Sequence, residues 1–197
     1  MGEDLKMTIC SVCETATLPY DGVYISDGDD SQLLCSKCYN EYSAKVCGVN
    51  FDHLSFHPIT LPDIDGEDHS FHFQTHLFGD KVHIRALEIK NDGPKGYEFL
   101  IYGDAEGDLF GLFAKLVDHI RCELGRKHIE NGDLAQYAIT KDDIVRGQIQ
   151  WDDDTDGQLP CLVIDGKELS WNELGRMLTS YEGWNFKLKI FEGIGEE

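Results

Sequence analysis

Two Cys-x-x-Cys hooks near the N-terminus constrain the fold of this chain more than any other feature. Cys10 and Cys13 form the first hook, and Cys35 and Cys38 form the second. Each hook closes around a metal ion as one tight turn, and two hooks supply the four thiolates of a tetrahedral zinc ion. The spacing therefore predicts that these four cysteines bind zinc, although it indicates no particular reaction.

Two other interpretations of the hooks stay open, namely disulfide bonds and an iron ion in a rubredoxin-like site. The first six residues, MGEDLK, lack the apolar core of a signal peptide, so we expect a reducing cytoplasm, where disulfides are rare. The ligand spacing favours zinc over both alternatives. Cys47 is a nearby fifth thiol, but four ligands already fill the tetrahedron, so we interpret it as a helix-end residue beside Gly48.

The residues between and after the hooks predict a hairpin followed by a helix. Apolar runs flank an Asp27-Gly28 turn, as in a hairpin. After the second hook, Tyr39, Tyr42 and Val46 recur at helical spacing, which places the second hook at a helix start, where N–H groups stabilise thiolates. With the four cysteines, this order of knuckle, hairpin and helix resembles the treble-clef class of zinc fingers, over about residues 7 to 48. The resemblance implies a closed, structural zinc site.

The strong negative charge argues against nucleic acid as a partner. The chain has 17 Lys and Arg against 37 Asp and Glu, for a formal charge of -20. Such a surface repels phosphate backbones, although many treble clefs bind nucleic acid. Only Lys6, Lys37 and Lys45 are available near the hooks. The acidity is interpreted either as a solubilising surface or as a docking surface for a basic protein partner.

The length of 197 residues suits a small metal-binding module and one domain of ordinary size. We predict a zinc-binding module over 1–48, a linker over 49–69 and an α+β domain over 70–197. Pro58 and Pro62 stiffen the predicted linker. Apolar runs are too short for a membrane span.

Alternating residues predict a hairpin at the start of the larger domain. Strands over 70–78 and 81–89 flank a Gly79-Asp80 turn, with phenylalanines on one face and histidines on the other. This register places His76 opposite His83.

The histidines give the chain its main alternative function, a metal-dependent hydrolase. His72, His76 and His83 would lie near a second metal ion, with Glu88 as the base. No spacing fixes a complete ligand set, so the competing interpretation is a polar sheet face that carries histidines. Whether the chain is an enzyme is left open, with a leaning toward no activity, and no catalytic or cofactor-binding residue is predicted.

A helix is predicted over 109–126 with Asp108 as its N-cap. His119 and Cys122 fall on its polar side, where they are interpreted as surface residues and not as a catalytic dyad. Its buried stripe is predicted to contain Leu109, Phe110, Phe113, Leu116, Val117, Ile120 and Leu124.

An acidic run resembles the start of a calcium loop at Asp152, Asp154, Asp156 and Gly157. The twelfth position is Val163, where calcium loops need a bidentate Glu. We therefore interpret the run as an acidic hairpin turn between strands over 144–151 and 160–164.

The C-terminal stretch predicts a helix and a final strand. Ser170 and Glu173 form a capping box for a helix over 171–181 that buries Leu174, Met177, Leu178 and Tyr181. Alternation from Trp184 predicts a strand over 184–191.

This tail, from Val163 to Ile190, resembles the end of a group of uncharacterised bacterial proteins, over about thirty residues. The resemblance implies a bacterial, cytoplasmic protein of unassigned activity.

Together these features predict an α+β protein with a small treble-clef-like zinc module and a mainly antiparallel sheet packed by two helices. The sheet would contain the strands over 70–78, 81–89, 97–102, 144–151, 160–164 and 184–191. The expected function is protein interaction or regulation, with zinc in a structural role.

Overall fold

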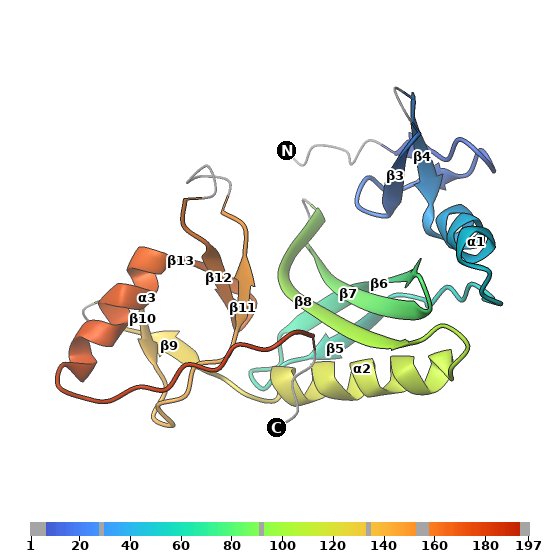
Figure 1. Ribbon diagram of the computed structural model, residues 1–197. Helices are drawn as coiled ribbons and strands as arrows, with labels where there is room; N and C mark the ends of the chain where they lie inside the picture. The colour runs from blue at the N-terminus through green and yellow to red at the C-terminus, as the bar shows by residue number, and fades with distance from the viewer. Residues whose placement is uncertain (1–6, 28–29, 91–92, 133–134, 153–157, 194–197) are drawn as a thin grey trace.

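The chain forms three successive parts: an N-terminal cysteine module, a central sheet with the long helix α2 below it, and a C-terminal part (Figure 1). The described residues contain three α-helices, and all their strand pairings are antiparallel, which confirms the predicted α+β class. None of these helices has the length and apolar character needed to cross a membrane. The structure, a computed structural model, describes residues 7–27, 30–90, 93–132, 135–152 and 158–193.

The cysteine module consists of two short antiparallel ladders and one helix. β3 and β4 form the predicted hairpin, whose turn residues 28–29 lie outside the described residues. The helix ends as predicted at Gly48, which has a left-handed φ of 67° and donates its N–H to Ala44 O. The elements are β1 (Thr8–Ile9), β2 (Ala16–Thr17), β3 (Gly22–Asp27), β4 (Asp30–Cys35) and α1 (Ser36–Cys47).

The central sheet has four strands in the order β5-β6-β7-β8. Gly79 and Asp80 form the turn between β6 and β7, and His76 lies opposite His83, as the sequence predicts. Residues 49–69, predicted to be a linker, contribute all of β5 and the start of β6 to this sheet. The strands are β5 (Ile59–Pro62), β6 (Asp68–Phe78), β7 (Lys81–Lys90) and β8 (Gly93–Asp104).

α2 (Leu109–Leu124) covers one face of the central sheet (Figure 1). Its N-cap is Asp108, as predicted, because the side chain accepts a hydrogen bond from Gly111 N. The prediction that Phe110 is buried is wrong: it is 66% exposed on the first turn, where its ring meets the edge of Phe56. The buried core combines Phe71, Phe73, Ile84 and Ala86 of the sheet with Leu116, Ile120 and Leu124 of α2.

The cysteine module covers the free edge of the central sheet. β5 pairs with β6 only as far as Phe71, so the rest of that edge has no neighbouring strand within the described part of the chain. Asn40 of α1 donates to Thr75 O at 2.7 Å and accepts from Leu77 N at 2.9 Å. This buried side-chain amide therefore takes the place of a neighbouring strand along β6.

The C-terminal part has its own small core, formed by Ile129, Leu162, Ile164, Leu169 and Met177. The predicted capping box is present, with Ser170 as N-cap and Glu173 as its partner. The elements are β9 (Ile129–Asn131), β10 (Tyr137–Ile139), β11 (Gln148–Gln150), β12 (Cys161–Ile164), β13 (Lys167–Ser170), α3 (Trp171–Leu178) and the 3₁₀ helix η2 (Thr179–Tyr181).

Three predictions about the larger domain are wrong. β11 and β12 form a separate three-stranded sheet with β13 and do not join the central sheet. Residues 184–191 form no strand; a strand pattern specifies which side chains share a face but does not supply a neighbouring strand. Leu178, predicted to be buried, is 47% exposed at the last residue of α3.

Candidate metal centre

The first hook is shaped by a tight turn between β1 and β2. Cys10 N–H donates to Thr15 O, and Cys10 O accepts from Glu14 N, both at 3.0 Å. Glu14 has a positive φ of 57°, a left-handed conformation that suits a closing turn. Ser11 N–H donates to Leu33 O at 2.8 Å, which fixes this hook against β4, the strand that leads into the second hook.

The second hook lies at a helix start, as predicted. Cys35 is the last residue of β4 and the N-cap of α1, and Cys38 follows in the first helical turn. The first N–H groups of a helix lack helical acceptors and carry a partial positive charge. This position favours the thiolate form of nearby cysteines.

The four hook cysteines bring their sulfur atoms together, all within 4.8 Å of one another. Cys13 Sγ and Cys35 Sγ are 3.7 Å apart. In a tetrahedral ion with metal–sulfur bonds of about 2.3 Å, the sulfur atoms lie about 3.8 Å apart. A disulfide requires about 2.05 Å. The cluster therefore has the spacing of a metal site, and all its cysteines are free thiols.

The thiols of the cluster differ in how readily they ionise. Burial raises the pKa of Cys10, but backbone N–H groups, led by that of Cys13, outweigh it and lower the pKa to about 6. Hydrogen bonds with Thr15 lower the pKa of Cys13. Burial raises the pKa of both Cys35 and Cys38, and at Cys35 it outweighs the opposite effect of the N–H group of Cys38 at the helix start. Because thiolates so close together repel one another, a bound cation favours the ionisation of all four.

The cysteine cluster also forms the centre of the module. Cys10 and Cys38 are buried, and with Leu34 they make up its buried apolar cluster. Cys47 is exposed at the end of α1 and is not part of the cluster. The module thus has few apolar contacts other than those of the candidate ligands.

The three histidines of the alternative site lie at the junction between the sheet and the module. His72 Nε2 is 3.3 Å from Asp21 Oδ2, and His76 Nε2 is 3.1 Å from Ser36 Oγ. The ring of His83 contacts that of His76 edge-on, with centroids 5.3 Å apart. Among the described residues, these histidines belong to no group of three side chains with metal-ligand spacing.

The environment of His76 keeps its ring neutral at pH 7. Burial lowers the pKa of His76 to about 4, and the positive charges of His83 and Arg85 contribute in the same direction. Asp21 acts in the opposite sense but does not offset the burial.

Glu88, the predicted base, lies on the other face of the sheet. It is opposite Phe71, and its Oε1 is 2.7 Å from His69 Nδ1. His69 in turn belongs to a second group with metal-ligand spacing, together with Asp63 and Glu67. This group was not predicted from the sequence, because it lies in the predicted linker. An Asp-x3-Glu-x-His pattern is informative only once the loop shape is known.

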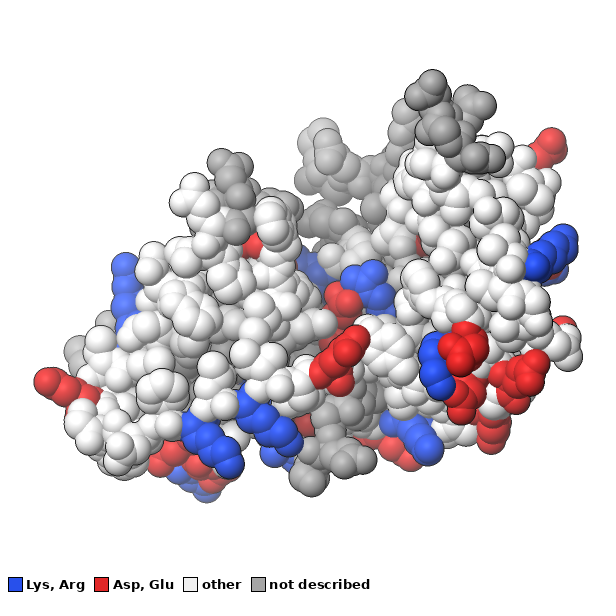
Figure 2. Space-filling model, viewed as in Figure 1, with Lys and Arg blue, Asp and Glu red and all other residues white. Residues whose placement is uncertain are grey.

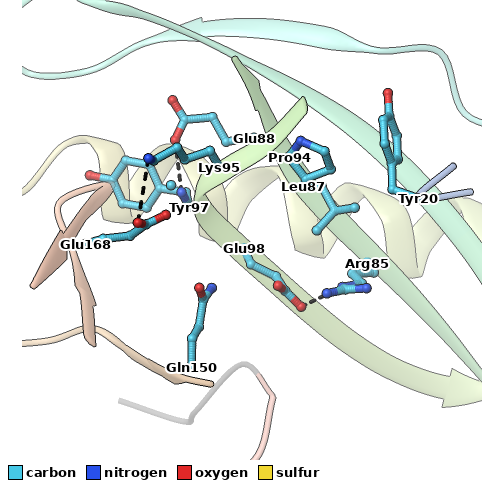
Figure 3. A pocket seen from close by; sticks show the side chains of 11 residues that line it. Tyr20, Arg85, Leu87, Glu88, Pro94, Lys95, Tyr97, Glu98, Gln150 and Glu168 are labelled. Atoms are coloured by element: carbon cyan, nitrogen blue, oxygen red, sulfur yellow. Dashed lines mark hydrogen bonds and ion pairs between the residues drawn. The ribbon is translucent and has the colours of Figure 1, made fainter. Parts of the chain in front are cut away.

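A cavity of about 230 Å³ lies where the three parts of the chain meet, with Tyr20, Lys95 and Gln150 among its lining residues. Two ion pairs lie along it, Arg85 with Glu98 and Lys95 with Glu168 (Figure 3). The described residues that line it include no serine, cysteine or histidine. These lining residues therefore supply no Ser–His or Cys–His pair.

The acidic run near Asp152 is only partly described. Asp154, Asp156 and Gly157 lie outside the described residues. The strands on either side pair as the hairpin interpretation predicts, with Gln150 opposite Cys161.

The fold and the cysteine cluster define the chain as an α+β protein with an N-terminal site that can hold a metal ion. Three family models match successive stretches, and each is described as a domain of unknown function. They are DUF7685 over residues 9–50, DUF7686 over 52–125 and DUF7713 over 128–194. These stretches correspond to the three parts of the fold. Comparisons with curated proteins and with solved structures found no match.

Proposed function

We propose that the four hook cysteines bind a structural zinc ion in a treble-clef-like module. The order of turn, hairpin and helix around the converging sulfur atoms supports this proposal. Four thiolates complete the coordination of zinc, so the ion has no open position for a substrate. Metal analysis of the purified protein tests the identity of the ion: one zinc per chain is expected, whereas iron would support the rubredoxin-like alternative.

We propose further that the chain acts by binding another protein. The observation that carries this proposal is the C-terminal segment Trp184–Phe191, which runs as a coil from the end of α3 toward the central sheet (Figure 1). Trp184 is 67% exposed and Phe186 is 91% exposed, and Leu188 and Ile190 are also exposed. Contiguous exposed apolar side chains are typical of protein interaction sites.

The alternation of this segment suits pairing with a sheet edge of the partner. Its apolar residues alternate with Asn185, Lys187 and Lys189, so an added strand would present one apolar and one polar face. In Figure 2, Lys and Arg side chains lie beside Asp and Glu side chains along the lower edge of the molecule, and much of the surface above them at the left is uncharged. Two copies, each with a formal charge of -20, repel one another. The proposed occupant is therefore a different protein with an apolar edge strand.

Site-specific crosslinking from position 186 tests this proposal in a cell lysate, after which the captured protein is purified and its affinity for the full chain is measured. We expect one defined partner, whose affinity falls at least about tenfold in Phe186→Asp. Ile149→Asp, at an exposed position of β11, is the control and should leave the affinity unchanged.

Three outcomes would contradict the proposal: failure of any captured protein to bind in purified form, equal weakening by the two variants, or self-association through the segment. Binding of nucleic acid through the cysteine module would instead support a nucleic-acid-binding function, against which the negative charge of the chain argues. The predicted domain boundaries and the reducing cytoplasmic location stay predictions.

A further inference from the structure

The turn between β5 and β6 is held in one shape by its own hydrogen bonds. Asp63 N–H donates to Glu67 O at 2.9 Å, and Gly66 N–H donates to Asp63 O at 3.1 Å. Asp63 Oδ1 accepts from the backbone N–H of Asp65 and of Glu67. The other carboxylate oxygen, Oδ2, lies 3.7 Å from His69 Nε2.

His69 is buried with one ring nitrogen unpaired. It is 6% exposed, and its Nδ1 is 2.7 Å from a carboxylate oxygen of Glu88, which places the ring proton on Nδ1. Nε2 is buried and has no hydrogen-bond partner among the described residues. Asp63 Oδ2 is too distant for a hydrogen bond to it. A buried lone pair facing a carboxylate is unfavourable unless a cation lies between them.

Glu88 fixes the orientation of the imidazole. It is 3% exposed, accepts a hydrogen bond from Tyr97 N at 2.9 Å and lies 3.3 Å from Lys90 Nζ. The Glu88 carboxylate can lie this close to the backbone because residue 96 is glycine: a Cβ at Gly96 would lie 2.1 Å from Glu88 Oε2. Carboxylates in this position orient metal-binding histidines in many metalloproteins.

We propose that Asp63, Glu67 and His69 bind a divalent transition-metal ion, through two carboxylates and the Nε2 atom. Their ligand atoms lie within 4.8 Å of one another. Atoms on opposite sides of an ion, each about 2.1 Å from it, are about 4.2 Å apart, so the side chains need to close by only a little. One imidazole and two carboxylates suit Mn²⁺ or Zn²⁺. Because Glu67 is exposed, the ion would keep open coordination positions facing solvent.

A Mn²⁺ titration distinguishes this site from the cysteine cluster, because carboxylates suit Mn²⁺ whereas thiolates select softer ions. Full-length protein with its cysteine site saturated with zinc is titrated, and the electron paramagnetic resonance signal of free Mn²⁺ is recorded. We expect saturable binding at one site per chain, weakened at least about tenfold in Glu67→Gln. Asp68→Asn is the matched control: it removes the same charge from the neighbouring exposed position and should bind normally.

The protonation of His69 gives a second, independent readout by nitrogen NMR. We expect Nε2 to be unprotonated without metal and its resonance to shift when Zn²⁺ is added. Absence of saturable Mn²⁺ binding, or equal weakening by Glu67→Gln and Asp68→Asn, would overturn the proposal. So would a proton on Nε2 that added metal fails to displace, because the ring would then be an imidazolium paired with its two carboxylates.

Discussion

The central sheet and α2 together bury seven side chains in one apolar cluster, whereas the N-terminal module buries three, two of which are candidate metal ligands. The sheet and α2 thus remove enough apolar surface from water to stabilise themselves. The module is too small for this, so we expect its stability to depend on a bound metal ion and on its contacts with the sheet. Two adjoining parts of one chain therefore depend on different interactions, and each can be perturbed separately.

The largest effect is expected from Cys38→Ser, which removes a buried candidate ligand. Metal binding contributes on the order of 10 kcal/mol to folding in small zinc modules, so the module should lose its metal and unfold while the central sheet stays folded. Metal analysis and limited proteolysis measure the two effects. Cys47→Ser, an exposed thiol on the same helix, is the control. Retention of a full metal equivalent at the cysteine site by Cys38→Ser would show that the module does not depend on this residue for metal binding.

Ile120→Ala tests the sheet side of the comparison. Ile120 is fully buried between α2 and the sheet, so the substitution should lower the free energy of unfolding by about 3 kcal/mol. Urea denaturation at constant zinc measures the loss, and the metal content of the folded protein should not change. Lys115→Ala, at an exposed position of α2, should change stability by less than about 0.5 kcal/mol. Loss of the metal in Ile120→Ala would show that metal binding by the module depends on the packing of the central sheet.

Asn40→Ala sharpens the comparison at the junction between the two parts. The substitution leaves Thr75 O and Leu77 N without their partners, at a cost of about 2 kcal/mol. Hydrogen exchange of the Leu77 amide should become faster, whereas Glu41→Ala, on the exposed side of α1, should leave it unchanged. Unchanged exchange in Asn40→Ala would mean that the module does not protect the sheet edge.

The smallest expected effect is a pH dependence that originates at His76. Its pKa is lowered to about 4 in the folded protein from an ordinary value of about 6.5, so the unfolded chain binds a proton first as the pH falls. The stabilisation is complete above pH 6.5 and is lost between pH 6.5 and 4, by about 1–2 kcal/mol for a partly exposed ring.

Urea denaturation with excess zinc at several pH values measures this dependence. His76→Gln should reduce its slope between pH 6.5 and 4, whereas the exposed His57→Gln should not. Equal slopes for wild type and His76→Gln would show that another group is responsible.

Local patterns predicted much of the fold. The hook spacing, the register that places His76 opposite His83, and the capping box at Ser170 each depend on residues close in sequence. Such features are specified by turn geometry and by the periods of helices and strands. For this reason they could be predicted without knowledge of the rest of the chain.

Features that depend on contacts between distant segments could not be predicted in this way. β12 is an apolar strand with buried side chains, like the central strands, and only its neighbours reveal that it belongs to another sheet. Asn40 is a polar helix residue, and its side chain is buried because it binds the edge of β6 at Thr75, 35 residues further along the chain. His69 faces Asp63 only because of the shape of one turn.

The amide of Asn40 also bears on how well the protein stays in solution. An unprotected strand edge is a template on which other chains can add strands and aggregate. While the module is docked, Asn40 occupies the two backbone groups that such a chain would need first. We therefore expect that chelation of the metal promotes fibrillar aggregation that starts at β6.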